Sequence, residues 1–572
     1  MNENYKYLKE WETAPFDLTK PIAFDTETCR PVDSKSKRKT LALYGDTRLM
    51  QFCQDGVVYM YDCFFMDIEE VKEYFLDAHL YAHNAIYDFN CPDLHFWIPR
   101  EIDDTICMLK HAKPEMDGFG LKNALEVFGI GEKGEEGASD WGVDELSPEQ
   151  LQYASDDVYN LEILHDQICY VKEEYKSYRL DMLNLRYSLN YARNGFPVRE
   201  SNRLKKIDDV IVTQFEYEML LPEGLNVQSP KQVCEFLGTP SAGVDILSDI
   251  ALDEKDARAD DANNILKLKK YTKQLSTLKD KFSFPRIYGI FNPYGANSGR
   301  WTCKGNGHTK ASQNLQQLPR ELKSVFGFED DNDMYLVDAD YTALEIHTAA
   351  TIMGEMKMIN IMHEGGDLHT ITAMGVFDKQ AEDITKYERQ IGKGLNFSLM
   401  YGAGATVAQI FIANMAGVRL PLAEVEVLRK KWLDTYPAIK AYHAKMGNMM
   451  RGRHGMTVYT PLGRPIWAKS YTESINVPCQ GAGQETTKLC HMLIAQRLPE
   501  AVQVNTVHDS VTLQVKGLEE AKRQAKILKK CLDDSWLMIS KDLPYKKLVM
   551  HNVAEVTKVY EGEAIWSTSD ED

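Results

Sequence analysis

The spacing of apolar and polar positions changes several times along the 572-residue chain. Short apolar runs at PIAFDTETC, LMQFCQ and VVYMYD predict three strands near the N-terminus, the first of them bounded by Pro21. Helical periodicity then alternates with loops up to about residue 170. This pattern predicts an α/β domain that ends between residues 170 and 185.

Beyond this domain the pattern changes twice. Long polar helices, interrupted by the turn-rich LPEGLNVQSPKQ and the acidic ALDEKDARADDANN, predict an extended helical module up to about residue 285. MYLVDADY then predicts a strand that leads into the helix TALEIHTAATIM, and VQVNTVHDSVTLQV predicts two alternating strands joined at HDS. The chain between these elements has a mostly helical pattern, and the polar tail STSDED is expected to be disordered.

One predicted helix, RQIGKGLNFSLMYG, raises a chemical question. Arg389, Lys393, Phe397 and Tyr401 recur at every fourth position and so form one stripe on a helix. An ordinary amphipathic helix could carry such a stripe, but two cations at this spacing repel each other by roughly 0.2–0.5 kcal/mol. Gly392 and Gly394 each cost a further 0.8–1 kcal/mol or so, relative to alanine, in a helix interior. Because a polyanion would use the cations and a flat base would stack on the rings, we interpret the stripe as a nucleotide-binding face.

Composition narrows the class of protein. No apolar run approaches the roughly 18 residues that a membrane span requires, and the N-terminus lacks the apolar core of a secretory signal. We therefore expect a cytoplasmic protein that is not secreted and does not bind a membrane. The 11 cysteines form no CxxC pair, which indicates neither a zinc ribbon nor a disulfide framework.

Charge is unevenly distributed. The net charge is −19, yet residues 262–328 contain twelve basic and only two acidic residues, interleaved with Tyr271, Tyr288, Tyr294 and Trp301. A solvated face and a nucleic-acid-binding surface with stacking aromatics both fit this composition.

Several carboxylates in the first domain occur in a suggestive order. Asp25 and Glu27 point to the same face of a predicted strand, where they repel unless a cation lies between them. Asp88 follows in AHNAIYDFN, and Tyr153 and Asp157 in YASDDV share one face of a helix. Each residue alone is typical of a cap or a solvated position. Together they resemble the DEDD exonucleases that carry a tyrosine, the proofreading fold attached to DNA polymerases.

This resemblance implies roles for the same residues. The four carboxylates would be ligands of two divalent metals, and Tyr153 would orient the attacking water. Asp156 competes with Asp157 for the last place, but the four-residue spacing from Tyr153 favours Asp157. Asp104 also matches a family position, outside the ligand set.

A second series of motifs covers the C-terminal part of the chain. In order, the motifs are SGRWT, QNLQQLPR, VDADYTALE, DLHTITA, RQIGKGLNFSLMYG, YPAI, LGRP, NVPCQG and VHDS. They resemble family A DNA polymerases, the class of bacterial DNA polymerase I and many phage replicases. The likeness is dense from about residue 290 to 515, and NVQSPKQVCEFLG near residues 226–238 extends it into the family's thumb region.

The resemblance implies that Asp340 and Asp509 are the catalytic metal ligands, 169 positions apart in the sequence. They would hold two Mg²⁺ ions, as the exonuclease carboxylates would, with Mn²⁺ as an alternative. Lys393 would grip the triphosphate together with Arg389 and would protonate the leaving group. Phe397 would stack near the sugar and base.

Three further positions bear on the incoming nucleotide. Tyr401 would lie under the templating position. Glu345 would crowd out a 2′-hydroxyl, which implies deoxynucleotides, and a phenylalanine at 397 instead of tyrosine implies poor use of dideoxynucleotides. His369 would assist at the phosphates, although a capping or packed histidine is the ordinary alternative.

Other matching positions would touch DNA, at the primer terminus or in the minor groove of the newest base pairs. They are Arg300, Asn314, Gln316, Asn476, Gln480 and His508. Two positions depart from the family pattern. Ser510 stands where a third carboxylate is expected, and Thr472 stands where an arginine is common, so we carry over only two metal ligands and leave that groove contact open.

We therefore expect an α+β multidomain protein with a ribonuclease H-like α/β exonuclease domain at residues 1–180, followed by a right-hand polymerase. The thumb would occupy residues 181–290, the palm 291–350 and 471–572, and the fingers 351–470.

The expected function is template-directed DNA synthesis with 3′–5′ proofreading. Nothing upstream of Asp25 is long enough for a 5′ nuclease, which favours a replicative, phage-like role in a bacterial host cytoplasm. Partners would be primer-template DNA, deoxynucleotides and a helicase, single-strand binding protein or processivity factor. Two alternatives stay open: an exonuclease or DNA-binding protein with an impaired polymerase site, and a single-subunit RNA polymerase, a class in which HDS also occurs.

Overall fold

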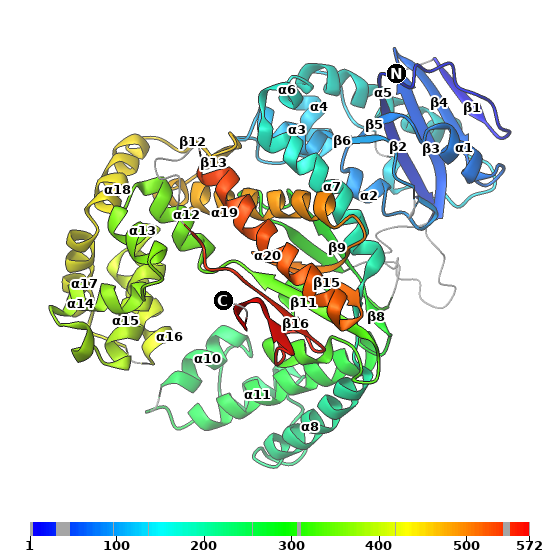
Figure 1. Ribbon diagram of the computed structural model, residues 1–572. Helices are drawn as coiled ribbons and strands as arrows, with labels where there is room; N and C mark the ends of the chain where they lie inside the picture. The colour runs from blue at the N-terminus through cyan, green and yellow to red at the C-terminus, as the bar shows by residue number, and fades with distance from the viewer. Residues whose placement is uncertain are drawn as a thin grey trace.

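Two separate sheets organise the chain in the computed structural model (Figure 1). The structure describes residues 4–29, 46–94, 97–134, 136–253, 255–305, 310–417, 419–541 and 549–570. A six-stranded sheet lies in the N-terminal part, and a five-stranded sheet combines one central strand with four C-terminal strands. No helix of the described residues is long and apolar enough to cross a lipid bilayer.

The N-terminal sheet has the order β1-β4-β3-β2-β5-β6. Its strands are β1 Tyr5–Leu8, β2 Pro21–Cys29, β3 Asp46–Gln54, β4 Val57–Asp62, β5 His79–Ala82 and β6 Glu101–Asp104. The runs PIAFDTETC, LMQFCQ and VVYMYD lie in β2, β3 and β4, so the three strand predictions are confirmed. These three strands pair antiparallel, whereas β5 and β6 join parallel to β2.

Helices pack against this sheet and carry two of the predicted carboxylates, Asp88 and Asp157. They are α1 Ile68–Tyr74, α2 Ala85–Asp88, α3 Thr105–Ala112, α4 Leu121–Val127, α5 Pro148–Ile168 and α6 Val171–Glu174. The α5 helix begins with a capping box between Ser147 and Gln150 and packs across β2, β3 and β4. Its buried Ala154, Val158 and Leu161 face the sheet, which fixes the side on which Tyr153 and Asp157 lie.

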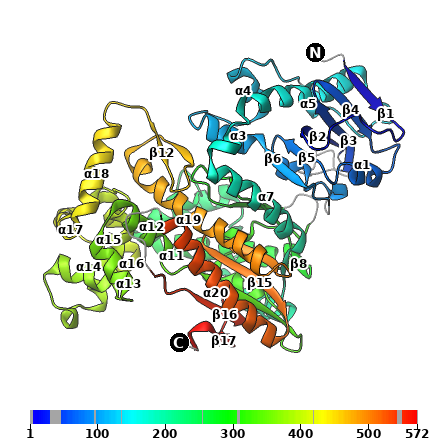
Figure 2. The ribbon, with the colours of Figure 1, turned by 45° about the horizontal axis from the view of Figure 1, so that its top comes forward.

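Helix α7, Lys176–Asn194, joins the N-terminal part to the rest and contains the expected boundary at residue 180. Figure 2 shows α7 between the N-terminal sheet and α19. The carboxylate of its fully buried Asp181 accepts from Lys488 Nζ at 2.5 Å and also pairs with Arg464. The two parts of the chain therefore share a buried charge network as well as apolar contacts.

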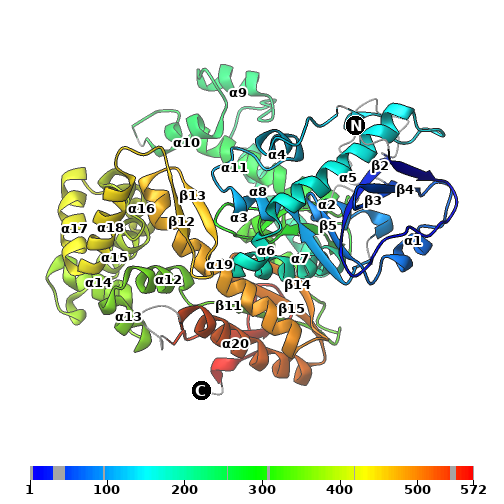
Figure 3. The same cartoon turned by 90° about the horizontal axis from the view of Figure 1, so that it is seen from above.

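A helical arm follows, as the sequence predicts. It comprises α8 Glu200–Glu218, α9 Pro230–Leu237, α10 Val244–Leu252, α11 Ala259–Ser276 and a π-helical turn at Thr277–Lys281. Helices α8 and α10 pack on α11, and a small core around Val233, Leu247 and Ile265 holds α9 and α10 at the outer end (Figure 3).

Short strands then lead back to the central sheet: β7 Phe196–Pro197, β8 Arg286–Ile287, β9 Gly289–Asn292 and β10 Thr302–Gly305. In this region the structure excludes a base-stacking role for two of the four aromatic residues of the basic segment. Tyr294 and Trp301 are buried, and the Tyr294 hydroxyl donates to Asp104 Oδ2 at 2.6 Å. Neither ring is available to stack on a base, because Tyr294 packs into the core of the N-terminal domain and Trp301 packs against Tyr191 and His491.

The central sheet has the order β14-β15-β11-β16-β17, with antiparallel neighbours. Its strands are β11 Met334–Asp340, β14 Val502–Val507, β15 Ser510–Lys516, β16 Val553–Thr557 and β17 Trp566–Ser567. Helix α20, Leu518–Ser540, packs on β11, β15 and β16, and α19, Tyr471–Arg497, packs on α20. The expectation of a disordered tail is wrong for residues 567–570: Ser567 ends β17, the next three residues form a 3₁₀ turn, and Thr568 Oγ1 accepts from the Ala554 amide. The last two residues of the tail lie outside the described residues.

The remaining helices form a group on one side of this sheet (Figure 1). They are α12 Leu344–Met353, α13 Met356–His363, α14 Leu368–Phe377, α15 Lys386–Leu399, α16 Ala405–Ala416, α17 Leu422–Thr435 and α18 Pro437–Met450. The hairpin of β12 Met456–Tyr459 and β13 Pro465–Ala468 returns the chain to α19. The expected boundary at residue 350 falls inside α12.

Candidate active sites

The central sheet brings Asp340 and Asp509 together. Asp340 ends β11, Asp509 lies in the turn between β14 and β15, and the ladder pairs Asp340 with Ser510. The two carboxyl groups consequently lie within hydrogen-bonding reach of each other, despite their separation in sequence. Burial and the neighbouring Asp509 carboxylate raise the pKa of Asp340 to about 7, and burial also raises the pKa of Asp509. Oxygen donors that are costly to ionise next to each other suit a hard divalent cation.

A third acidic residue, Asp338, lies on the same face of β11. Its Oδ1 accepts from Thr512 Oγ1 at 2.5 Å, two cross-strand pairs along the ladder from the pair of Asp340 and Ser510. Burial raises the pKa of Asp338 to about 7. The sequence analysis missed this residue, although two aspartates at alternate positions in MYLVDAD are a usable signal, since alternate strand residues share a face.

The turn that presents Asp509 is held from α19. His508 has a left-handed backbone with φ of 56°, a strained conformation for a residue other than glycine. Gln484 Nε2 donates to the His508 carbonyl at 3.0 Å, and Gln484 Oε1 accepts from the Trp301 amide at 3.3 Å. Gln484 was also missed, although it follows the predicted Gln480 by one helical turn in NVPCQGAGQ.

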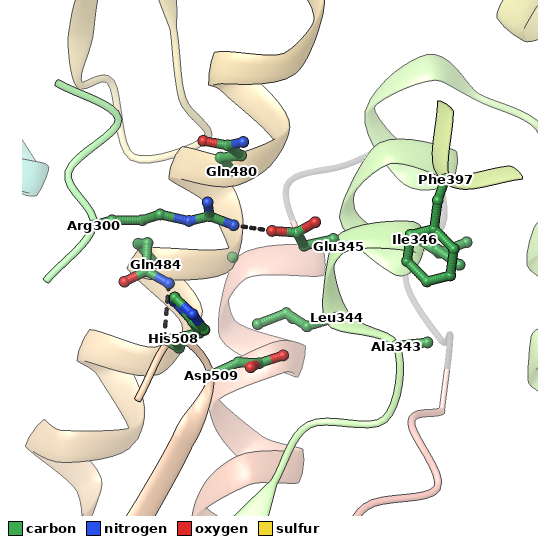
Figure 4. A pocket seen from close by; sticks show the side chains of 11 residues that line it. Arg300, Ala343, Leu344, Glu345, Ile346, Phe397, Gln480, Gln484, His508 and Asp509 are labelled. Carbon is green, nitrogen blue, oxygen red and sulfur yellow. Dashed lines mark hydrogen bonds and ion pairs between the residues drawn. The ribbon is translucent and has the colours of Figure 1, made fainter. Parts of the chain in front are cut away.

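A pocket of about 350 Å³ opens beside these residues (Figure 4). Its walls come from the Arg300 loop, α12, α15, α19 and the β14–β15 turn. The lining residues are Arg300, Ala343, Leu344, Glu345, Ile346, Phe397, Gln480, Gly483, Gln484, His508 and Asp509. Arg300 and Glu345 form an ion pair across it. Six residues predicted at five separate motifs thus line one cavity.

Helix α15 carries most of the predicted stripe. Thr385 and Glu388 form its capping box, and the helix ends at Leu399, so Tyr401 follows the last turn. The Tyr401 hydroxyl donates to the Glu345 carbonyl at 3.4 Å. The half-buried Lys393 has its ammonium 5.9 Å from the Phe397 ring centroid.

The two glycines of α15 have a role in helix packing, although the interpretation from sequence argued against a purely structural cause. A Cβ at Gly392 would lie 2.6 Å from the His369 carbonyl oxygen on α14, and one at Gly394 would lie 3.0 Å from Ile412 Cα on α16. Side chains at either position would push the three helices apart. The glycines therefore report close helix packing, and the interpretation of the stripe depends on its cations and rings alone.

The predicted phosphate-binding cation Arg389 is paired in this structure. Its Nε and a terminal nitrogen donate to the Asp367 carboxylate at 2.5 and 3.2 Å, a geometry that a phosphate could share. His369 lies close by, with its ring 5.9 Å from that of Phe397 and its Nδ1 3.1 Å from Asn396 Nδ2. Burial lowers the pKa of His369 to about 4, so the ring is neutral at physiological pH.

The predicted DNA-contacting residues differ in their surroundings. Asn314 caps a 3₁₀ turn through the Gln316 amide, and Gln316 Nε2 donates to the Thr506 carbonyl at 3.2 Å, so both side chains support the fold locally. Asn476 Oδ1 is buried and has no hydrogen-bond partner among the described residues. A buried acceptor of this kind is available for a donor on a ligand.

A second acidic cluster lies on the N-terminal sheet. Carboxylate oxygens of Asp25 and Glu27 on β2 and of Asp157 on α5 all lie within 4.8 Å of one another. Burial and the Asp157 charge raise the pKa of Asp25 to about 7, and burial and Asp25 raise the pKa of Glu27. Asp88 at the end of α2 accepts from Thr26 Oγ1 at 2.7 Å, and burial and Asp25 raise its pKa. The four predicted carboxylates converge, and their oxygens fit divalent cations.

Tyr153 lies against Asp157, one turn apart on α5, and a loop between α4 and α5 closes over it. A Cβ at Gly134 would be 2.9 Å from Tyr153 Cδ2, and a Cβ at Gly137 would be 2.6 Å from its hydroxyl. Lys133 from the same loop donates to Asp157 Oδ2 at 2.6 Å. Lys133 was not among the predicted site residues, and its acidic, glycine-rich surroundings gave no signal for it.

Two alternatives for these carboxylates have other roles. Asp156 accepts from Gln152 Nε2 at 3.0 Å on the same helix. Asp104 caps α3 through the Ile106 and Cys107 amides and accepts from Tyr294. Both placements agree with leaving them outside the predicted ligand set.

Two other groups of metal-ligating side chains are satisfied internally. In the group Cys107, His111 and Asp181, the carboxylate is paired with Lys488 and Arg464. In the group His79, Glu101 and Asp103, Lys172 donates to both carboxylates, at 2.6 and 3.3 Å. Neither group is a candidate site, because each has at most two carboxylates and these already pair with Lys, Arg or His side chains.

Comparisons with known proteins agree with this geometry. The family described as DNA polymerase family A matches residues 203–546, more than half of the chain, and the family described as 3′-5′ exonuclease matches residues 3–170. The chain is 25% identical to DNA polymerase I of Aquifex aeolicus over 94% of its own length and 95% of that protein. It is 26% identical to the thermostable DNA polymerase I of Thermus thermophilus over 44% of its length and 30% of that protein.

A solved structure has a similar fold. It is the POL domain of Pol1 from M. smegmatis in complex with DNA primer-template and dNTP, at a TM-score of 0.68 and 16% identity. The match covers 94% of this chain and 95% of that chain. Both sheets and the helical groups described above thus belong to a known arrangement.

Proposed function

We propose, from the premise that the chain belongs to DNA polymerase family A and carries a 3′-5′ exonuclease domain, that it extends a primer at Asp340 and Asp509 and proofreads at Asp25, Glu27, Asp88 and Asp157. The enzyme is a DNA-directed DNA polymerase with 3′-5′ exonuclease activity. The observation that carries the site assignment is the convergence of Asp340, Asp509 and residues of α12, α15 and α19 on one pocket.

At the polymerase site, Asp340 and Asp509 would hold two Mg²⁺ ions, with Mn²⁺ as an alternative. When bound, the ions would activate the primer 3′-hydroxyl and neutralise the pyrophosphate that leaves. The triphosphate would take the place of Asp367 on the Arg389 guanidinium. Lys393, half-buried and one turn away, would supply the second cation and the proton for the leaving group.

The sugar and base would lie in the pocket beside α15. Phe397 would stack near them, and Glu345 would stand where a 2′-hydroxyl would point. Tyr401 bonds to the Glu345 backbone, which would hold the gating carboxylate in place. His369 is neutral and hydrogen-bonded to Asn396, so it would contact phosphate as a neutral donor rather than as a cation.

Duplex DNA would lie along the turn at His508 and along α19. Arg300, Gln480 and His508 line the pocket, and the unpaired oxygen of Asn476 lies one turn before Gln480. We propose these four as the primer and groove contacts. For Asn314 and Gln316, which bond within the protein, we propose that they support the primer contacts from beneath.

The domain assignment follows the same logic. We propose that the sheet with α19 and α20 is the palm, α13–α18 the fingers, and α8–α11 the thumb, with the N-terminal sheet as the exonuclease. The expected boundaries at residues 180 and 350 fall inside α7 and α12. If the domains move as rigid bodies, each of these helices would move as a unit with one of the two domains that it joins.

In the exonuclease, the carboxylates of Asp25, Glu27, Asp88 and Asp157 would hold two Mg²⁺ ions. Tyr153 lies beside Asp157, where it would orient the water that attacks the last phosphodiester. An exonuclease with all four carboxylates in place beside a polymerase supports copying with error correction. We therefore propose a replicative, phage-like role, with a helicase, single-strand binding protein or processivity factor as accessory partners.

One experiment tests both sites. A labelled primer on a longer template is incubated with Mg²⁺, once with four deoxynucleotides and once with none. The wild-type protein should extend the primer in the first reaction and shorten it in the second. Asp340→Asn should abolish extension and keep shortening, whereas Asp25→Asn with Glu27→Gln should do the reverse.

The exposed Asp333→Asn, at the other end of β11, is the matched control and should behave as wild type. Normal extension by Asp340→Asn would overturn the polymerase site. Shortening by wild type in both reactions would support an impaired polymerase, and extension with ribonucleotides alone would support an RNA polymerase.

A further inference from the structure

Among the residues that the structure describes, Lys133 forms an ion pair with one of the exonuclease carboxylates. Its ammonium lies 2.6 Å from Asp157 Oδ2, and the Asp157 carboxylate is almost fully buried. Asp25 and Glu27 complete the cluster, with oxygens within 4.8 Å of those of Asp157. The lysine therefore lies at the position where cations would bind, although it comes from a loop and not from any element that carries the carboxylates.

The loop is held near the cluster by its contact with Tyr153. Gly134 and Gly137 both lie against the Tyr153 side chain, too close for a Cβ at either position. The Lys133 ammonium also lies 5.3 Å from the centroid of the same ring. Lys133 thus approaches the site from the Tyr153 side, where the attacking water would have to be positioned.

The charge of Lys133 affects how the carboxylates could bind a metal ion. Buried carboxylates that face each other repel strongly unless a cation compensates them. A lysine can do so with one charge, but a divalent ion at the same oxygens would do it with two, and both cannot occupy the same space. Lys133 and a metal are thus alternatives at Asp157.

We propose that Lys133 is an internal counter-ion that competes with divalent metal for the exonuclease carboxylates, so that metal binding must displace the Lys133 ammonium from Asp157. This rests on the proposed function, because it takes the cluster to be the metal site of excision. The lysine would keep the site folded when metal is absent and would raise the metal concentration that excision requires.

The test is Mn²⁺ binding, followed by electron paramagnetic resonance without DNA or nucleotide. The polymerase site is silenced with Asp340→Asn and Asp509→Asn, so that binding reports the exonuclease cluster. In this background Lys133→Met should bind Mn²⁺ at least about tenfold more tightly, because it removes a cation from the binding position. Lys133→Arg keeps the charge and should bind like the parent, and Lys122→Met, an exposed lysine on α4, is the matched control.

A second readout excludes a folding defect. In EDTA, Lys133→Met should unfold at a lower temperature than the parent, and saturating Mn²⁺ should raise its unfolding temperature by more than it raises that of the parent. Equal or weaker Mn²⁺ binding by Lys133→Met would overturn the inference. If the parent itself binds no Mn²⁺ that Asp25→Asn with Glu27→Gln removes, the proposed metal site fails instead, and with it the premise.

Discussion

Asp340 and Ser510 are direct cross-strand partners in the β11–β15 ladder. The Ser510 hydroxyl donates to the Val507 carbonyl at 3.2 Å, so it serves the hairpin and offers no charge to a metal. The carboxylate that the family would place here is missing, while Asp338 lies two cross-strand pairs along the ladder on the same face. The negative charge near the proposed metal site is therefore distributed differently from the family pattern.

Ser510→Glu would place a carboxylate opposite Asp340 again. We expect the Mg²⁺ concentration for half-maximal primer extension to fall by roughly threefold to tenfold, because an added negative charge attracts the cation. The measurement is extension rate against Mg²⁺ concentration, with Ser510→Gln as the uncharged control of similar size. An identical Mg²⁺ dependence for both variants would show that position 510 does not act on the metal.

Glu345→Ala should weaken the rejection of ribonucleotides. The side chain lines the pocket and is held by Arg300 and by the backbone contact with Tyr401, so its removal opens space where a 2′-hydroxyl would lie. We expect the ratio of kcat/KM for deoxynucleotide over ribonucleotide to fall by about 10- to 200-fold, the range for a pocket that loses a small steric contact. Glu345→Gln keeps the volume and should keep most of the discrimination; an unchanged ratio in the alanine variant would remove Glu345 from the sugar pocket.

Much of the fold was predictable where local pattern decides it. The strands β2 and β4 match the predicted runs, and β14 and β15 meet at the predicted turn, because alternation and turn residues specify both. The final strand β17, only two residues long, was not predictable from local pattern, since its order comes from pairing with β16 and from Thr568. Tyr294 and Trp301 were misread for the same reason: an aromatic in a basic segment becomes buried only through tertiary contacts.

The sites were predictable where residue type and spacing carry the chemistry. Asp25, Glu27 and Asp157 were found through strand and helix periodicity within the motif order. Lys133 and Gln484 were not, because they act on residues that lie next to them only in the folded chain. Gly392 and Gly394 show the opposite case. Two glycines inside a helix were correctly noticed as unusual, but close helix packing explains them without any ligand.

The pKa of Asp340 predicts how the metal-free protein responds to pH. A carboxyl group with a folded pKa of about 7, above its unfolded value near 3.8, binds its proton more tightly when folded. Its contribution to stability is therefore complete at low pH and is lost as pH rises through about 7. In EDTA, the unfolding temperature of wild type should fall relative to Asp340→Asn between about pH 4 and about pH 7, because the amide cannot ionise; the two should agree below about pH 4. A constant difference across this range would mean that Asp340 titrates as it does in the unfolded chain.

Asp181 predicts how firmly the exonuclease is attached to the polymerase. Asp181 and Lys488 are both inaccessible to solvent, and burial lowers the pKa of Lys488 to about 8 even with the carboxylate beside it. Asp181→Asn would leave two buried cations without a counter-ion and should cost roughly 3–5 kcal/mol of unfolding free energy. Adding Lys488→Met removes one of these cations and should restore part of the loss, whereas Asp434→Asn, which breaks the exposed pair with Lys440, should leave unfolding unchanged. The measurements are the free energy of chemical unfolding, the unfolding temperature by calorimetry, and the rate of limited proteolysis between the two domains. If Asp181→Asn unfolded like wild type, the buried network would contribute nothing to the attachment, and the apolar contacts of α7 with α19 would account for it.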